Sequence, residues 1–180
     1  MAGDKNIFGS YNYNKVFIET GCYKGDGIQK ALDVGFLKVI SIEITPLYFN
    51  MCKERFKDDS RVEIAFGDSS KEIGEIIKDI DESITYWLDG HYSDSTTLHG
   101  AKLCPLMDEL EAIKEHAIKY NDTILIDDRR CWSKSDWFYQ FYQFTAEDIE
   151  ARIKGINPKY VITYDDGYIP DDVIVAQIRN

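Results

Sequence analysis

The sequence predicts an α/β protein built on one mostly parallel sheet of seven strands, with helices on both faces. Two observations lead to this fold class. Short runs rich in β-branched and aromatic residues alternate with stretches of helical periodicity along most of the chain. Near the C-terminal end, two further apolar runs are joined by a turn-rich link containing Asp166-Gly167, which indicates an antiparallel hairpin. A length of 180 residues suits a single domain covering 1–180.

Each expected element can be located by its pattern. The parallel strands are expected at Val16–Ile18, Val39–Ile44, Val62–Phe66, Ile84–Leu88 and Thr123–Ile126. Helices are expected between them at Gly27–Val34, Leu47–Phe56, Ser70–Ile80 and Pro105–Tyr120. The hairpin strands are expected at Tyr160–Tyr164 and Val173–Ile178. Because parallel strands separated by helices need cover on both faces, this order favours a Rossmann-like sheet closed by a C-terminal antiparallel hairpin.

Composition excludes some classes of function. The formal net charge of −11 disfavours nucleic acid as a partner, because binding phosphates requires clustered Lys and Arg. The same charge favours a cationic cofactor. The four cysteines are widely spaced with no CxxC motif, so we expect free, reduced thiols. Residues 1–14 show no apolar signal-peptide core and no apolar run is long enough to cross a membrane, so we expect a cytoplasmic protein.

The loop after the first strand is the expected cofactor site, because ligands of open α/β sheets bind at the carboxyl ends of the strands. This loop contains Glu19, Thr20, Gly21, Tyr23 and Gly25. Its glycines allow the backbone to pass close to a ligand, or simply to make a tight turn into the next helix. Their spacing is not GxGxxG, which argues against a nicotinamide cofactor.

Acidic residues after the second and third strands extend this site. Glu43 ends the second strand, where a carboxylate can accept hydrogen bonds from two ribose hydroxyls. Asp68 and Ser69 follow the third strand, where a polar side chain contacts a nucleoside base. Asp68 is equally well explained as the N-cap of the next helix, and both interpretations can hold.

Carboxylates also end the fourth and fifth strands. Asp89 follows one of these strands, and the pair Asp127-Asp128 follows the other. Carboxylates that converge without a cation repel one another, and oxygen ligands are those that Mg²⁺ or Mn²⁺ prefers, so we expect a divalent metal there. His91 lies two residues beyond Asp89 and is the expected catalytic base, with Asp89 also counted as catalytic. A strand-end histidine that bonds a neighbouring loop is the simpler alternative for His91.

These stretches resemble the macrocin and mycinamicin type of sugar O-methyltransferase, a class I methyltransferase that uses S-adenosylmethionine and Mg²⁺. The similar segments are Glu19-Thr20-Gly21 with Gly25, Asp89-Gly90 with Ser95-Thr96, and Ile126-Asp127-Asp128. The resemblance implies that Asp89, Asp127 and Asp128 bind the metal and that His91 is the base. It also implies that a homodimer can form. Glu19, in the loop after the first strand, is expected either to orient the methionine amine of the cofactor or to brace the loop as a capping carboxylate. Two departures stand out, because the relatives commonly have an acidic residue near the position of His91 and an aromatic residue where this chain has Arg129-Arg130.

The acceptor is the least specified part of the sequence-based prediction. His91, Tyr92, Arg129 and Trp132 are the expected substrate contacts, whereas His116 is expected to be an exposed helix residue. The aromatic segment Cys131–Phe144 either packs on the sheet or contacts substrate, with Trp132 the best candidate for contact. The function expected is O-methylation of a sugar or glycan. The alternatives are a catechol-type small-molecule methyltransferase and a catalytically silent cofactor-binding interaction module.

Overall fold

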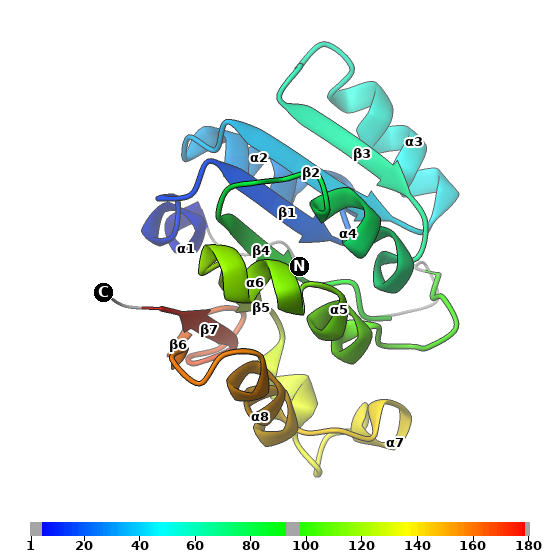
Figure 1. The fold of residues 1–180 in the computed structure, drawn as a ribbon. Coiled ribbons are helices and arrows are strands. Elements are labelled where there is room, and N and C mark those ends of the chain that lie inside the picture. The colour runs from blue at the N-terminus through cyan, green and yellow to red at the C-terminus, as the bar shows by residue number, and fades with distance from the viewer. Residues whose placement is uncertain (1–4, 93–97, 179–180) are drawn as a thin grey trace.

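The computed structural model describes residues 5–92 and 98–178, which form a seven-stranded sheet with helices on both faces (Figure 1). The strand order is β3-β2-β1-β4-β5-β7-β6. The strands are β1 (Val16–Thr20), β2 (Lys38–Glu43), β3 (Val62–Phe66), β4 (Ile84–Leu88), β5 (Thr123–Ile126), β6 (Val161–Asp165) and β7 (Val173–Gln177). Neighbouring strands from β3 to β5 are parallel, and β7 runs antiparallel to both β5 and β6. The predicted fold class is therefore confirmed.

One face of the sheet is covered by the helices of the first part of the chain. These helices are α1 (Lys5–Ser10), α2 (Asp26–Asp33) and α3 (Pro46–Arg55). Their buried side chains, among them Phe8 and Ile28, pack with Phe17, Trp87 and Leu125 of the sheet in one hydrophobic cluster. Helix α1 was not expected from the sequence.

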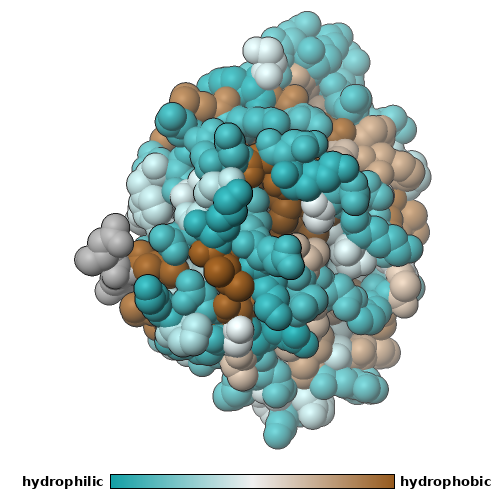
Figure 2. Space-filling model, viewed as in Figure 1, coloured by the Kyte–Doolittle hydropathy of each residue, from teal (hydrophilic) through white to brown (hydrophobic). Residues whose placement is uncertain are grey.

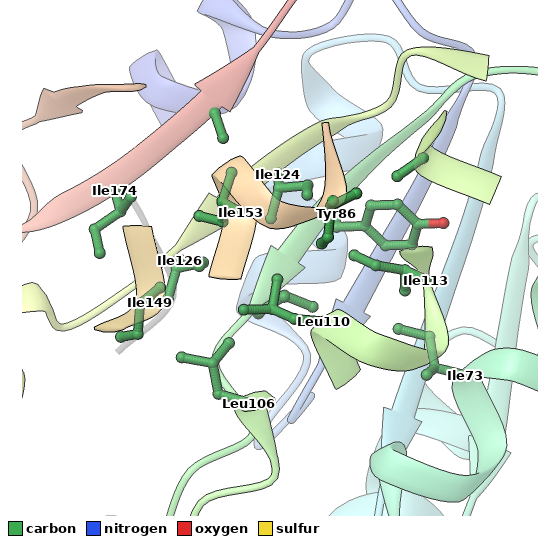
Figure 3. Close-up of a cluster of buried hydrophobic side chains, with 14 of the residues drawn as sticks. Ile73, Tyr86, Leu106, Leu110, Ile113, Ile124, Ile126, Ile149, Ile153 and Ile174 are labelled. Carbon is green, nitrogen blue, oxygen red and sulfur yellow. The ribbon is translucent and has the colours of Figure 1, made fainter. Parts of the chain in front are cut away.

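The opposite face carries the second set of helices, which is nearer the viewer in Figure 1. These are α4 (Ser69–Ile77), α5 (Leu106–Ala112), α6 (Lys114–Tyr120) and α8 (Ala146–Ile156). Figure 3 shows their apolar side chains, such as Ile73, Leu110 and Ile153, packed around Tyr86 and Ile124 of the central strands. This face as seen in Figure 2 is largely hydrophilic, with hydrophobic residues confined to small areas between polar ones. Since both faces of the sheet are covered, every residue of β1, β4 and β5 is buried, and most of these residues are apolar, as in other parallel sheets of this kind.

Three details differ from the sequence-based expectations. The single helix expected at Pro105–Tyr120 is divided at Ile113 into α5 and α6, which both pack on α8. The aromatic segment after β5 forms a short 3₁₀ helix, η1 (Arg129–Trp132), and α7 (Tyr139–Tyr142). Helix α8 was not expected, although Thr145 and Asp148 form a capping box at its start, a pattern that sequence inspection can recognise.

The expected exposure of His116 is wrong. Its side chain is buried between α6 and the start of β5, where Nδ1 lies 2.7 Å from Asp122 Oδ2 and Nε2 lies 2.9 Å from the Ile80 carbonyl. Asp122 in turn accepts a hydrogen bond from the backbone N–H of Ile84. The pair therefore links α6 to the start of β4, and helical periodicity alone could not indicate this tertiary partner. The four cysteines are free and buried, as expected.

Candidate active site

A cavity of about 720 Å³ opens at the carboxyl ends of β1, β2, β3 and β4. The strand order reverses between β1 and β4, and this reversal is where open α/β sheets bind their ligands. Its volume lies within the range of small-molecule and cofactor sites. Eight predicted site residues line it: Glu19, Gly21, Tyr23, Glu43, Asp68, Ser69, Asp89 and His91.

The loop after β1 has the tight backbone expected of a ligand-binding turn. Gly21 has a φ of +85°, and a Cβ at this position would lie 2.9 Å from the Asp89 carbonyl oxygen. Only glycine therefore lets the ends of β1 and β4 approach so closely. Gly25, also at φ +85°, precedes α2 and packs against Phe56, so its role is in the turn rather than in lining the cavity. Tyr23 lines the cavity with its ring centroid 4.5 Å from that of Tyr48, a cavity residue that no sequence motif indicated.

Thr20 does not line the cavity, in contrast to the expectation that it contacts cofactor. Its side chain is fully buried, and its hydroxyl oxygen accepts a hydrogen bond of 3.1 Å from the backbone N–H of Asp89. Thr20 therefore joins the ends of β1 and β4 beneath the cavity.

Two buried glutamates line the cavity from β1 and β2. Glu43 accepts hydrogen bonds from the backbone N–H groups of Thr45 at 2.7 Å and Tyr23 at 3.1 Å, so it holds the two loops together. Glu19 accepts a hydrogen bond of 2.8 Å from Ser41 Oγ. Burial raises the pKa of Glu19 to about 8, an effect that the hydrogen bond from Ser41 only partly offsets. A positively charged group bound in the cavity would restore the ionised form of Glu19.

Asp68 is both a helix cap and a cavity residue. Its Oδ1 accepts hydrogen bonds from the backbone N–H and the hydroxyl of Ser70 at the start of α4, as the N-cap interpretation expected. The strap of residues 98–105, which follows β4, crosses the cavity beside it. Leu98 donates its backbone N–H to Thr45 Oγ1 at 3.1 Å, and a Cβ at Gly100 would overlap the Asp68 carboxylate. The strap therefore closes one side of the cavity.

The acidic residues that end β4 and β5 influence one another electrostatically. Burial, with the neighbouring charge of Asp127 next in importance, raises the pKa of Asp89 well above its ordinary value. Burial and the charge of Asp128 raise the pKa of Asp127 to about 7. The repulsion between carboxylates that the sequence analysis expected therefore adds to the larger effect of burial.

His91 lies between the acidic ends of β4 and β5, at the edge of the cavity. Its Nε2 is 3.1 Å from Asp128 Oδ2, and its Nδ1 is 3.6 Å from Asp89 Oδ1. The imidazole edge packs on Trp132, with the ring centroids 5.5 Å apart. The structure thus places Asp128, a predicted metal ligand from the end of β5, beside His91 and Asp89, the predicted catalytic residues that follow β4.

Asp128 is neutralised by partners that the sequence analysis did not foresee. Its Oδ1 lies 2.6 Å from Arg130 Nη1, and Arg130 also pairs with the buried Asp172 of the β6–β7 turn. Burial raises the pKa of Asp128, but the hydrogen bond from His91 and the charge of Arg130 together lower it below its ordinary value. Asp128 also has a left-handed backbone, with φ at 61°.

Two groups of three potential ligand residues come together among the described residues, with one ligand atom of each within 4.8 Å of the others. The first consists of Asp127, Asp128 and Asp172, and the second consists of His91, Asp128 and Cys131. Asp89 lies outside both groups. Asp172 was not predicted, because its proximity depends on β7 lying next to β5, which its position in the hairpin sequence does not reveal.

The predicted substrate contacts lie away from the cavity lining, apart from His91. Tyr92 donates its backbone N–H to the Leu103 carbonyl and accepts a hydrogen bond from Tyr142 at its own carbonyl, so it anchors the strap. Arg129 stacks over Tyr164 of β6 at 4.2 Å, and Trp132 is buried in the core. Residues Ser95 and Thr96, part of the stated resemblance, and Thr97 lie outside the described residues.

Comparisons with known proteins agree with this architecture. No family model matches the chain, and no curated protein matches its sequence. Solved structures do match. A Podospora anserina methyltransferase bound to S-adenosylhomocysteine (SAH) is similar with a TM-score of 0.66 and 12% identity, over 98% of this chain and 78% of that one.

Two O-methyltransferases are similar to the same degree. One, from Bacillus cereus in complex with SAH, has a TM-score of 0.62 and 12% identity, over 96% of this chain and 76% of that one. The other, TomG from Streptomyces achromogenes, is involved in tomaymycin synthesis and was solved with S-adenosylmethionine. It has a TM-score of 0.64 and 10% identity, over 98% of this chain and 79% of that one. The chain therefore has the fold of the S-adenosylmethionine-dependent methyltransferases.

None of the helices among residues 5–92 and 98–178 has the length and apolar character needed to span a membrane.

Proposed function

We propose that the protein is an S-adenosylmethionine-dependent O-methyltransferase that acts on a hydroxyl of a small acceptor, a sugar or glycan being the favoured class. The observation that carries this proposal is the cavity at the reversal of strand order, with acidic residues and His91 at one end of it. The fold shared with methyltransferases, including O-methyltransferases, supports the reaction class.

The chain's residues fit S-adenosylmethionine. Glu43 lines the cavity at the end of β2, where a carboxylate can meet ribose hydroxyls, and Asp68 with Ser69 lines the base side. Glu19 and Asp89 are buried carboxylates of raised pKa, which a cationic amine and sulfonium would stabilise in the ionised form. When bound, the cofactor supplies an electrophilic methyl group on a positively charged sulfur.

The chemistry of the acidic cluster also fits a divalent cation, as the resemblance to sugar O-methyltransferases implied. Asp89 and Asp127 have pKa values raised by burial and by neighbouring carboxylates, and a divalent cation bound nearby would relieve that repulsion. The Asp128 Oδ1 atom would become a ligand only by exchanging its contact with Arg130 for one with the cation. The ligands are oxygens, which favours Mg²⁺ or Mn²⁺. Such an ion would supply Lewis acidity to the acceptor oxygen.

His91 is proposed to take the acceptor's proton. Hydrogen bonding of Nε2–H to Asp128 would place the proton-accepting lone pair on Nδ1, the nitrogen nearer Asp89. Bound S-adenosylmethionine would supply the methyl group and leave as the neutral thioether, and His91 would accept the proton that the acceptor hydroxyl loses. The Asp128 carboxylate, 3.1 Å from Nε2, would then stabilise the imidazolium.

The experiment is a transfer assay with radiolabelled S-adenosylmethionine against panels of free sugars, nucleotide sugars and catechols, with Mg²⁺ or with chelator. We expect methylation of a sugar class that is lost in chelator. Methylation of catechols instead would favour the catechol-type alternative. SAH binding without turnover on any acceptor would favour the silent binding module. Turnover that persists in chelator would exclude the metal role while leaving the methyltransferase assignment intact.

A matched pair of variants tests the acidic cluster. Asp127→Asn keeps the size of the side chain but removes a buried charge, and we expect turnover to fall by about 100-fold or more, as when a group that stabilises developing charge is lost. SAH affinity should stay close to that of the native protein. Asp166→Asn, at an exposed position in the β6–β7 turn, is the control and should leave turnover unchanged. An Asp127→Asn variant with the turnover of the native protein would contradict the role given to Asp127 in the acidic cluster.

A further inference from the structure

Glu109 is a buried acidic residue that the proposed chemistry does not use. It lies on α5 and is 1% exposed, whereas its helix neighbour Glu111 is exposed. Burying a carboxylate is costly unless hydrogen bonds compensate it, so its partners show what it does in the fold. Helical periodicity placed this position on an expected helix but gave no sign that an acidic residue faces inward.

The carboxylate of Glu109 connects the loops that follow three different strands. Its Oε1 accepts a hydrogen bond of 2.5 Å from Ser69 Oγ, at the loop after β3. The hydroxyl of Thr20, the last residue of β1, donates to Glu109 as well, and that hydroxyl accepts the backbone N–H of Asp89. After β4, a Cβ at Gly90 would lie 3.2 Å from Glu109 Oε1, so the backbone between Asp89 and His91 rests directly on the carboxylate.

These contacts place Glu109 under the floor of the cavity. Ser69, Asp89 and Gly90 all line the cavity, and Glu109 touches two of them and reaches the third through Thr20. Burial raises the pKa of Glu109 to about 7, while hydrogen bonds from Ser69 and Thr20 act in the opposite direction. No backbone hydrogen bond of the sheet ladder joins β3 to β4, because β2 and β1 lie between them. Glu109 supplies a direct link across that gap.

We infer that Glu109 is a positioning residue for cofactor binding and methyl transfer, which fixes the Ser69 loop and the Asp89–His91 segment relative to each other. The inference rests on the proposed function, since it concerns the same cavity. A shift of about 1 Å in the reacting groups is enough to cost about 100-fold in rate. Loss of this link therefore affects SAH affinity and turnover more than it affects folding.

The test compares Glu109→Ala and Glu109→Gln with Glu111→Ala, measured on the full chain. Glu111 is on the same helix and pairs with Arg152 at the surface, so it controls for removing a charge from α5. Calorimetry gives the dissociation constant for SAH, and the transfer assay gives kcat and KM for S-adenosylmethionine. We expect Glu109→Ala to weaken SAH binding by at least about tenfold and to lower kcat/KM by about 100-fold. Glu109→Gln keeps an oxygen that accepts from Ser69 and Thr20, and should recover most of the loss.

Two results would overturn the inference. The first is Glu109→Ala that is folded and keeps native SAH affinity and turnover. The second is a Glu109→Gln variant whose SAH affinity and turnover are as low as those of Glu109→Ala. That result would show that the charge of Glu109 matters and that the hydrogen bonds from Ser69 and Thr20 do not. If Glu109→Ala does not fold, Thr20→Val decides instead, since it removes one hydroxyl donor while keeping the side-chain volume. Native SAH affinity in Thr20→Val would then overturn the inference, and weakened affinity would support it.

The outcome separates this inference from the proposed function. A native protein that is folded but does not bind SAH would overturn both. A native protein that binds SAH and methylates, beside a Glu109→Ala variant that does the same, would overturn the inference alone.

Discussion

The residues that follow the parallel strands either line the cavity or support it from beneath, as Thr20 does by joining the ends of β1 and β4. Glu43, Asp68, Asp89 and His91 were predicted from their position after apolar runs, and all four line one cavity. The parallel sheet explains this success, because the carboxyl ends of parallel strands lie at one edge. Thr20 was expected to contact cofactor but is buried beneath the cavity. Sequence position could place Thr20 at the edge but could not tell which way its side chain points.

Gly21 gives a test at the same scale. Its φ of +85° and the 2.9 Å separation of an added Cβ from the Asp89 carbonyl oxygen leave no room for a side chain. We expect Gly21→Ala to lower the free energy of unfolding by about 1–3 kcal/mol through backbone strain, and to weaken SAH binding as well. Chemical denaturation and calorimetry measure the two effects.

Gly155 provides the matched control. It lies in α8 with no atom within 4 Å of an added Cβ. Gly155→Ala should therefore raise the free energy of unfolding by about 0.5–1 kcal/mol, as alanine does in helix interiors. Equal effects of the two substitutions would show that close approach at Gly21 does not matter.

Among the elements, the strands were predicted more closely than the helices and connections. The bounds of β3, β4 and β5 agree with those expected, because each is an apolar run ended by polar residues. The 3₁₀ helix η1 was not expected, because it belongs to an aromatic segment without clear periodicity. Helix α8 was not expected either, although its buried Ile149, Ile153 and Ile156 recur at helical spacing. The contact of the β6–β7 turn with Asp128, through Arg130 and Asp172, depends on tertiary packing that no local pattern encodes.

Asp172 tests the link between the hairpin and the active site. It is fully buried and accepts hydrogen bonds from the backbone N–H groups of Arg130 and Tyr168. Asp172→Ala should lower the free energy of unfolding by about 1–3 kcal/mol, because buried donors lose their acceptor. Asp166→Ala, at an exposed position in the same turn, should change it by less than about 0.5 kcal/mol. Denaturation that ranks the two variants in the opposite order would contradict the role given to Asp172.

At the scale of the whole molecule, buried acidic side chains are concentrated in and beneath the cavity, whereas the Lys and Arg residues that line it are exposed or half-buried. Burial raises the pKa of Glu19 to about 8 and that of Glu109 to about 7, against an ordinary value of 4.5. Burying such carboxyl groups costs little free energy only when they are protonated or when a cation is bound beside them. The strand order that brings these groups together was predictable, whereas their depth of burial was not, because burial depends on the strap and on α5.

These shifts predict how stability depends on pH. The folded pKa values lie above the unfolded ones, so the folded state binds more protons between about pH 4.5 and 8. The contribution of Glu19 and Glu109 is therefore fully present below about pH 4.5 and is lost as pH rises through about 7 to 8. We expect the melting temperature of the ligand-free protein to fall from pH 6 to pH 8.5, and to fall less in Glu19→Gln. A native profile that rises over this range, or a Glu19→Gln profile of the same slope, would contradict the raised pKa values.

Calorimetric titration of SAH into the native protein tests the central claim most directly. The account predicts saturable binding of one SAH per chain, weakened by Glu43→Ala, whose carboxylate lies at the end of β2 in the cavity. Absence of binding at millimolar SAH to a protein shown to be folded, or binding that Glu43→Ala leaves unchanged, would contradict the assignment of this cavity to the methyl-donor cofactor.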